Sequence, residues 1–218
     1  MSATGSPAWG DELARRPVLA ERTIHDGRVF DLVSRDVDLG EAGVVTREFT
    51  RHPGAVAVVV LRERACLEVL LLRQYRVPVG AYLWEIPAGL LDGGAEETLL
   101  LAAQRELAEE ADLVARRWDV LVDFATTPGA TDEAIRVFLA RDPQVAPRSD
   151  FVREGEESEI ELAWVPLAEA VEAVLAGRMH SPSATLGVLA AAASERTGFT
   201  SLRDVSAPFV LRPDRTPA

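Results

Sequence analysis

The chain has 218 residues, of which 48% are hydrophobic and 27% charged, values typical of a globular protein with an ample core. Its formal net charge of −12 argues against nucleic acids and anionic membranes as partners, because both repel an acidic protein. A single cysteine, Cys66, excludes an intramolecular disulfide and a cysteine-based zinc site. Cys66 lies in an apolar stretch, so we expect it to be inert packing in a strand.

The first part of the chain predicts a loose arm followed by a small sheet. Residues 1–18 are rich in Ser, Gly, Pro and charge, which is typical of a mobile terminus. They contain no apolar signal-peptide core, and no run approaches membrane-spanning length, so we expect a cytoplasmic protein. Three short strands by themselves make a marginal sheet, so we expect residues 19–52 to pack on the main domain or on another subunit. The strands are expected at residues 23–24, 29–37 and 44–49, with Gly-containing turns between them.

The main domain is expected over residues 53–205, and residues 206–218 are expected to form a tail that is mobile after Phe209. Residues 55–61 are a continuous apolar run, as expected of a central strand covered on both faces. A mixed sheet between helices, an α/β fold, follows from this pattern. The other strands are expected at residues 67–73, 83–86, 118–125, 135–140 and 161–165, and alanine-rich helices at 167–176 and 182–194.

The centre of the chain is a glycine-containing loop followed by a helix. Residues 87–89 read Pro-Ala-Gly and residues 92–94 read Asp-Gly-Gly. From about Glu96 to Ala111 there is no Pro or Gly, and good helix formers dominate. The predicted buried side of this helix consists of residues at helical spacing: Leu100, Ala103, Leu107 and Ala111.

Three glutamates, Glu106, Glu109 and Glu110, crowd the C-terminal turns of this helix. Each carboxylate opposes the helix dipole at a cost of roughly 0.3–1 kcal/mol, and like charges at i,i+4 add about 0.2–0.5 kcal/mol. A solvent-exposed acidic face is the simpler interpretation, but it leaves these costs uncompensated. A bound divalent cation removes them, and Mg²⁺ favours carboxylates together with phosphate oxygens and water. The helix therefore predicts a metal site for a phosphorylated substrate.

Glu97, followed after seven residues by Arg105-Glu106-Leu107-x-Glu109-Glu110, resembles the Nudix box, the loop-helix signature of Nudix hydrolases. Two positions depart from the box, because Leu91 stands where a glycine is usual and Asp112 replaces a late glycine. Both departures concern the loop geometry rather than the carboxylates. The segments WEIPAGLLD, QYR, TTPGATDEAIRVFLA and EGEESEIEL are similar to the ADP-ribose pyrophosphatase branch, especially its actinobacterial members, over roughly residues 29–198.

The resemblance implies a Nudix α/β/α sandwich with a mixed sheet, plus a small N-terminal antiparallel sheet. It implies Mg²⁺-dependent hydrolysis of ADP-ribose to AMP and ribose 5-phosphate, with Mn²⁺ as a substitute metal. Alternatives are a pyrophosphatase for another NDP-sugar or a dinucleotide polyphosphate, and a non-catalytic Nudix domain that senses ADP-ribose. The acidic balance and the lack of a basic helix-turn-helix pattern weigh against the sensor. Family dimers further imply a homodimer through the N-terminal sheet.

The resemblance assigns metal ligation to the Ala88 carbonyl, Glu106 and Glu110, with Glu109 as a ligand or as a partner of one. Arg105 would orient these glutamates by ion pairing. Glu97 either fixes the loop or is an ordinary acid at the start of the helix.

A general base must come from outside the helix if all its glutamates hold metal. The acidic stretch at residues 154–159 is the candidate. Glu157 matches the base of the branch best, and Glu156 is second. A solvated acidic loop is the alternative interpretation of this stretch.

Substrate contacts are implied at Arg47, Arg76, Glu85, Asp132 and Glu133. Arginines suit a diphosphate because their guanidinium groups make bidentate contacts, although a surface arginine is the alternative for Arg76 and a polar edge-strand residue for Arg47. In family dimers the equivalent of Arg47 reaches the active site from the partner's N-terminal sheet. Glu85, Asp132 and Glu133 resemble positions around the riboses, and Asp132 could equally cap a turn. The three histidines, His25, His52 and His180, follow no ligand spacing and are interpreted as structural.

Overall fold

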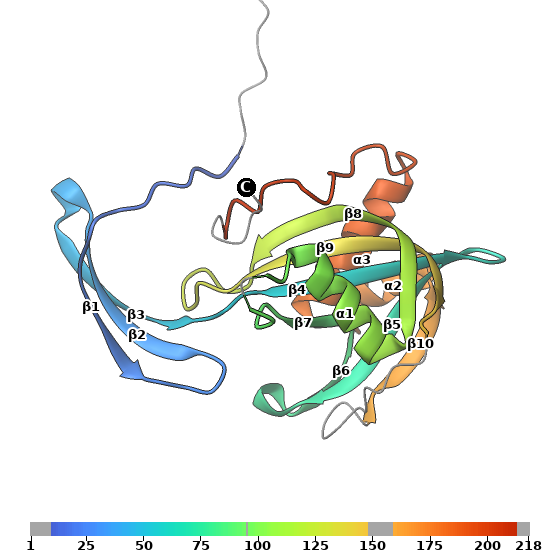
Figure 1. Ribbon diagram of the computed structural model, residues 1–218, viewed down its shortest axis with the longest axis horizontal. Coiled ribbons are helices and arrows are strands. Elements are labelled where there is room, and N and C mark those ends of the chain that lie inside the picture. Colours follow the sequence, from blue (N-terminus) through green and yellow to red (C-terminus); the bar gives the residue numbers. More distant parts are fainter. Residues whose placement is uncertain (1–9, 95, 148–158, 213–218) are drawn as a thin grey trace, which may run out of the picture.

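The computed structural model describes residues 10–94, 96–147 and 159–212, which form two sheets and three α-helices (Figure 1). The small sheet is antiparallel and has the order β1-β2-β3; the large sheet follows the path β10-β5-β4-β9-β8, with β6 paired to β5 and β7 to β4. The strands are β1 (Val18–His25), β2 (Asp31–Asp38), β3 (Val44–Arg51), β4 (Ala55–Glu63), β5 (Leu67–Arg76), β6 (Ala81–Glu85), β7 (Ala88–Leu90), β8 (Leu113–Ala125), β9 (Ala134–Val145) and β10 (Glu161–Pro166). The helices are α1 (Leu99–Ala111), α2 (Leu167–Leu175) and α3 (Pro182–Glu195).

Strand β4 lies at the centre of the large sheet, and its alternate side chains point to opposite faces. Val56 and Val58 pack with α1 on one face, whereas Ala57 and Val59 pack with α2 and α3 on the other. All four side chains are fully buried. Strand β4 runs parallel to β9 and antiparallel to β5, so the sheet is mixed. The predicted sandwich of helices around a mixed sheet, with a doubly covered central strand, is therefore confirmed. Within the described ranges no helix is long and apolar enough to cross a membrane.

The N-terminal sheet stands beside this body, without a helix over it in Figure 1. Every residue of β1 is exposed, although Val33 and Ser34 of β2 are buried. Strand β1 has eight residues, whereas the sequence predicted a two-residue strand. The polar pair Glu21 and Arg22 interrupts the alternation of apolar and polar residues by which a strand is usually predicted. A strand exposed to solvent needs no such alternation, so the sequence did not indicate the full length of β1.

Residues 50–54 join the two sheets. Thr50 forms a parallel bridge with Thr131 in the β8–β9 loop, and the His52 N–H donates to Asp132 Oδ1 at 2.8 Å. The His52 Nδ1 accepts the Gly54 N–H at 3.1 Å, which is a structural role, as the sequence suggested. Gly54 has a φ of +86°, a conformation that glycine adopts without strain. We call residues 50–54 the joint.

The C-terminal segment contradicts the predicted mobile tail as far as Arg212. Phe209 is fully buried in the core on the α1 side of the sheet. Arg212 donates hydrogen bonds to the carbonyls of His52 and Pro53, each at 2.8 Å. The prediction failed because both residues pack against partners distant in sequence, which a local composition of Pro and Arg does not reveal. Residues 213–218 lie outside the described part of the chain.

Cys66 lies in an exposed turn between β4 and β5, so the prediction that it packs in a strand was wrong. The two strands form an antiparallel hairpin in which Glu63 faces Leu67. The residues between them must therefore reverse the chain, and the apolar strand pattern resumes only at Leu67.

Gly187 allows α3 to pack closely on the sheet. A Cβ atom at this position would lie 2.7 Å from Val59 Cγ2 and 3.2 Å from Ile86 Cδ1, both in the core. No side chain fits this gap without displacing β4 or the helix. The short side chains of the buried alanines in α3, Ala184 and Ala191, allow the same close packing on the sheet.

We expect Gly187→Val to lower the free energy of unfolding by about 1–3 kcal/mol, because the added side chain overpacks the core between α3 and β4. Urea unfolding measures this change. Ala193→Val is the matched control, since it places the same β-branched residue at an exposed position of the same helix. Helix propensity favours Gly187→Val and disfavours Ala193→Val, so a loss in Ala193→Val as large as in Gly187→Val would contradict the packing argument.

Candidate active site

Helix α1 begins at Leu99, later than predicted, because Thr98 is its N-cap and accepts the Leu101 N–H at 3.2 Å. Glu97 therefore lies in the preceding loop and not in the helix. At the other end, Asp112 adopts the left-handed conformation, with φ 53° and ψ 37°. Aspartate tolerates this conformation better than most residues, so the departure from glycine there leaves the helix end intact.

The buried side of α1 differs slightly from the prediction. Ala103, Leu107 and Ala111 are buried as expected, whereas Leu100 is only half-buried and Leu99 takes its place in the core. Glu106 and Glu110 are themselves buried, at 9% and 8% exposure. Their carboxylates therefore lie at the border of the core, and a merely solvent-exposed acidic face does not describe them.

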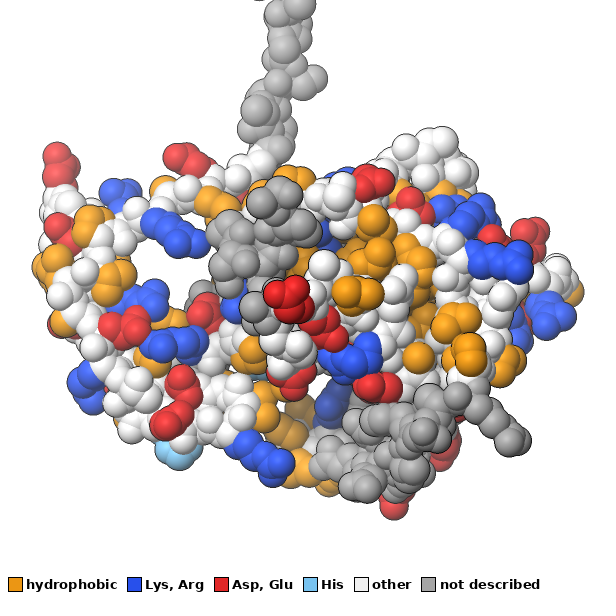
Figure 2. All heavy atoms as spheres, in the orientation of Figure 1, with side chains coloured by type: hydrophobic (Ala, Val, Ile, Leu, Met, Phe, Trp, Pro, Cys, Tyr) orange, Lys and Arg blue, Asp and Glu red, His pale blue; other side chains and the backbone are white. Residues whose placement is uncertain are grey.

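Arg105 gathers the acidic side chains at the start and end of the helix. Its Nη1 lies 2.6 Å from Glu106 Oε1 and 3.1 Å from Glu109 Oε2. Its Nε lies 2.9 Å from Glu97 Oε1, and Asp92 is a more distant partner at 3.8 Å. Figure 2 shows acidic and basic side chains together over the region of α1. Arg105 thus ties the loop to the helix and contacts both Glu106 and Glu109.

Gly89 makes room for the Glu106 carboxylate. A Cβ atom on Gly89 would lie 2.0 Å from the carboxyl carbon of Glu106. Gly93 is equivalent for Glu97, whose carboxyl oxygen would lie 2.2 Å from an added Cβ. The role of these two glycines as space for carboxylates was missed in the sequence, where they read only as turn residues. The loop before α1 also contains a short strand, β7, where only a turn was expected.

Glu110 accepts the Ala88 N–H through Oε2 at 2.9 Å. Ala88 pairs with Ala57 of β4, so the central strand fixes the backbone that faces Glu110. Among the described residues, no group of three or more His, Cys, Asp or Glu side chains is arranged to hold a metal directly. The reason is that Arg105 draws Glu106 and Glu109 to itself while Ala88 holds Glu110. Three carboxylates on adjacent turns beside one arginine nevertheless form a donor set that suits a divalent cation.

The electrostatics of the helix follow from burial and from Arg105. Burial raises the pKa of Glu106, and the charge and hydrogen bond of Arg105 oppose this rise. The hydrogen bond to Glu97 is the largest of the effects that raise the pKa of Arg105, with Glu106 and Glu109 adding to it. The raised pKa of Arg105 means that its guanidinium group stays charged.

Arg76 and Glu85 form a bidentate ion pair at the edge of the site. The Arg76 Nε and Nη2 donate to the two carboxylate oxygens of Glu85 at 2.8 and 2.6 Å, and the Gln74 amide adds a contact of 3.4 Å. Glu85 is buried, whereas the Arg76 side chain is 42% exposed. Glu85 thus orients Arg76, and the plain surface arginine considered from the sequence does not describe this geometry.

The other predicted substrate residues lie around the joint rather than beside α1. Asp132 accepts the His52 N–H, which is the cap role considered from the sequence. Glu133 accepts the Thr126 hydroxyl at 2.8 Å and lies 3.5 Å from His52 Nδ1. Arg47 donates to the Thr46 carbonyl and lines a cavity of about 510 Å³ that Asp132 also lines. Glu156 and Glu157 lie outside the described residues.

The chain matches the NUDIX domain family over residues 50–186. It is 40% identical over 195 residues to the ADP-ribose pyrophosphatase of Mycobacterium tuberculosis, covering 89% of this chain and 91% of that protein. It is 36% identical over 157 residues to the ADP-ribose pyrophosphatase of Bacillus subtilis, covering 72% of this chain and 81% of that protein. A crystal structure of an ADP compounds hydrolase shares the fold, with a TM-score of 0.67 at 20% identity over 87% of this chain and 98% of that one. The chain belongs to the Nudix family of hydrolases.

We expect Arg105→Gln to lower the free energy of unfolding at neutral pH by about 1–3 kcal/mol in the absence of divalent cations, because the carboxylates around it lose their charged partner. Burial already raises the pKa of Glu106, and losing Arg105 raises it further. A raised folded-state pKa means that ionisation destabilises the fold as pH rises, so the deficit shrinks at acid pH, where the carboxylates are protonated.

Chemical denaturation at acid and at neutral pH measures the deficit. Arg105→Lys is the control, because it keeps the positive charge and should lose less stability than the glutamine variant. A deficit of the same size at both pH values would contradict the electrostatic explanation.

Proposed function

We propose that the protein hydrolyses the diphosphate of ADP-ribose to AMP and ribose 5-phosphate in the presence of Mg²⁺. The observation that carries this is the constellation of Glu106, Glu109 and Glu110 beside Ala88, bordered by the Arg76–Glu85 pair. Carboxylates and an oriented arginine are the groups that a metal-bound diphosphate requires. The names of the two similar pyrophosphatases support ADP-ribose as the substrate.

The metal would be held by Glu106, Glu110 and the Ala88 carbonyl, with Glu109 as a further ligand or a partner of one. Mn²⁺ is the expected substitute. When bound, the metal neutralises the diphosphate and lowers the pKa of a water molecule that can then act as the nucleophile. The gap at Gly89 lets the Glu106 carboxylate lie against the backbone of β7, close to Ala88.

The remaining residues of the site would bind and orient the substrate. Arg105 would orient Glu106 and Glu109 through its hydrogen bonds and tie the loop to the helix through Glu97. Glu85 binds the Nε and Nη2 edge of the Arg76 guanidinium group and so fixes its orientation, and Arg76 would then contact a phosphate of the substrate. Arg47 would contribute a second cation from the N-terminal sheet.

The general base would come from outside α1, since its glutamates are committed to Arg105, to Ala88 and to the metal. Glu157 is the first candidate and Glu156 the second. Both belong to the acidic stretch before β10, and β10 pairs with β5, the strand that ends at Arg76.

We expect the native chain to release AMP from ADP-ribose with Mg²⁺, and Glu110→Gln to lower kcat/KM by about a hundredfold or more, because a metal ligand matters at least as much as the groups that orient it. The released AMP is measured by chromatography. Glu96→Gln is the matched control, since it makes the same change at an exposed position of the loop before α1 and should retain activity.

Different failures point to different alternatives. Tight binding of ADP-ribose without turnover would favour a non-catalytic sensor. Neither binding nor turnover would overturn ADP-ribose as the substrate and direct the search to other NDP-sugars and dinucleotide polyphosphates. Loss of activity in Glu96→Gln as large as in Glu110→Gln would contradict the specific role of Glu110.

The N-terminal sheet supports the further proposal of a homodimer, in which Arg47 reaches the partner's site. A three-stranded sheet with no covering layer is marginal in water. Several large apolar side chains of this region are exposed in the single chain, and contact with a second copy would cover them. They are Val18, Leu19, Ile24, Val29, Phe30 and Val44.

Residence in the cytoplasm agrees with the acidic composition and the unpaired cysteine.

We expect the 23.6 kDa chain to elute as a dimer, and Leu19→Asp to shift it towards the monomer and reduce ADP-ribose turnover, because a buried unpaired charge opposes association. Light scattering coupled to gel filtration measures the mass. Leu175→Asp is the control, because Leu175 is an equally apolar residue exposed on α2. A native monomer with full activity would refute both the dimer and the role of Arg47.

A further inference from the structure

The C-terminal segment crosses the molecule from the edge of the large sheet to the joint. At its start, Arg203 forms a two-way bridge with Val120 of β8, with N–H to carbonyl distances of 2.9 and 3.3 Å. The bridge lies at a register shift in β8, where a strand edge would otherwise be open. We call residues 203–212 the strap.

Arg136 of β9 anchors the middle of the strap. It is 1% exposed and forms a bidentate ion pair with Asp123 of β8, at 2.8 and 2.9 Å. The same guanidinium donates to the carbonyls of Ala207 and Pro208 at 2.6 and 2.9 Å, and it lies 4.8 Å from the centre of the Phe209 ring. A buried arginine is stable only when its donors and charge are satisfied, so this network fixes the strap on the sheet.

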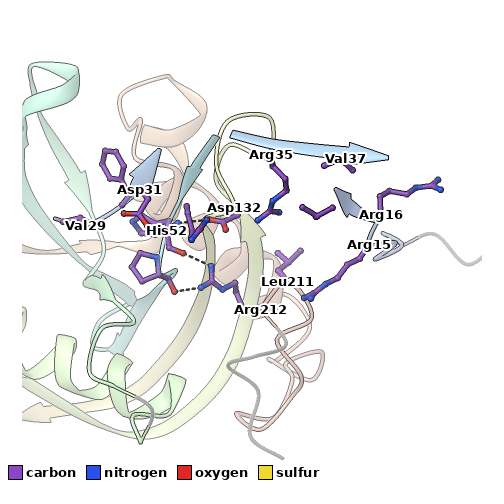
Figure 3. A pocket seen from close by; sticks show the side chains of 14 residues that line it. Arg15, Arg16, Val29, Asp31, Arg35, Val37, His52, Asp132, Leu211 and Arg212 are labelled. Carbon is purple, nitrogen blue, oxygen red and sulfur yellow. Dashed lines mark hydrogen bonds between the residues drawn. The ribbon is translucent and has the colours of Figure 1, made fainter. Parts of the chain in front are cut away.

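At its end the strap reaches the joint through Arg212. Figure 3 shows this side chain with dashed lines to the carbonyl oxygens of His52 and Pro53, at the wall of a cavity of about 950 Å³. These two carbonyls follow the last residue of β3 and precede β4, so they lie outside the strand ladders. Pro53 has no N–H of its own. The planar guanidinium group of Arg212 carries several N–H donors, so it can bind both adjacent carbonyls at once.

The joint is also tied to the loop before α1, the segment that contains Ala88. The Gly54 carbonyl accepts the Leu91 N–H at 3.1 Å. A Cβ atom on Gly54 would lie 3.4 Å from Leu91 Cδ1 and 3.6 Å from the Arg212 guanidinium carbon. The strap, the joint and the loop before α1 therefore meet at one place, with Phe209 and Leu91 in the same core cluster.

We infer that Arg212 is a positioning residue that sets the orientation of the N-terminal sheet relative to the catalytic body. It acts on the backbone of the joint, and through it on the placement of Arg47 on β3. Its kinetic consequence rests on the proposed hydrolysis of ADP-ribose, whereas its structural consequence does not. A role in positioning predicts an effect on substrate binding, and a role in general stability predicts loosening of the whole fold.

The test compares the full-length native chain with Arg212→Ala and Arg212→Lys, and with Arg196→Ala as a control at an exposed arginine after α3. Hydrogen exchange is measured at three amides that tie the joint to its neighbours: Thr50 and His52 donate from the joint to Ala130 and Asp132, and Leu91 donates to the Gly54 carbonyl. We expect exchange there to accelerate by about tenfold in Arg212→Ala, the effect of losing roughly two hydrogen bonds. Amides between β5 and β10, distant from the strap in sheet order, should keep their rates.

The kinetic arm uses ADP-ribose with Mg²⁺. We expect KM to rise about tenfold in Arg212→Ala with kcat little changed, because only the binding geometry is altered. Arg212→Lys should recover part of the loss, since an ammonium group can donate to one of the carbonyls, and Arg196→Ala should match the native chain.

Unchanged exchange at the joint would overturn the inference, and so would an equal acceleration between β5 and β10. A fall in kcat with unchanged KM would also overturn it. If the native chain does not hydrolyse ADP-ribose, the proposed function fails by itself, while the exchange rates of the joint still decide the role of Arg212.

Discussion

The structure depends on how the positive charge of Arg105 is shared among several carboxylates. Arg105 contacts Glu97, Glu106 and Glu109 within hydrogen-bonding distance, and Glu110 is held separately by the Ala88 N–H. Each of these acids near the end of α1 opposes the helix dipole, so the helix is destabilised by the residues that its chemistry requires. The surrounding fold compensates: α1 packs on the buried part of strand β4, and the same strand fixes Ala88. The stability of the sheet thus maintains an acidic cluster that an isolated helix would not tolerate.

Close approach is the second constraint, and glycine meets it at three places. Gly89 and Gly93 leave room for carboxylates, and Gly187 lets α3 lie on Val59. In each case a Cβ atom would fall within 3 Å of another residue's side chain. These glycines therefore act through the volume that they do not fill, and not through unusual backbone angles.

The sequence predicted the parts of the molecule whose cause is local. The apolar run of β4 and the carboxylates of α1 were visible because period and spacing are properties of neighbouring residues. Boundaries were less accurate: Glu97 was placed inside the helix, since only the Thr98 side chain marks its start. The contacts of the C-terminal segment escaped prediction because they join distant parts of the chain: Arg136 donates to Ala207, 71 residues away, and Arg212 donates to His52, 160 residues away. Spacing along the sequence carries no signal for contacts of that kind.

This difference between local and distant causes bears on function as well. The metal end of the candidate site is formed by one loop and one helix, so a short motif is sufficient to specify it. The substrate end depends on how the N-terminal sheet, the β8–β9 loop and the strap meet, and there Asp132 and Glu133 serve the joint through His52. In the proposed function, a change at the joint would alter the groups that face the nucleotide, because Arg47, Asp132 and Glu133 lie around it, while the carboxylates of α1 lie on a separate element.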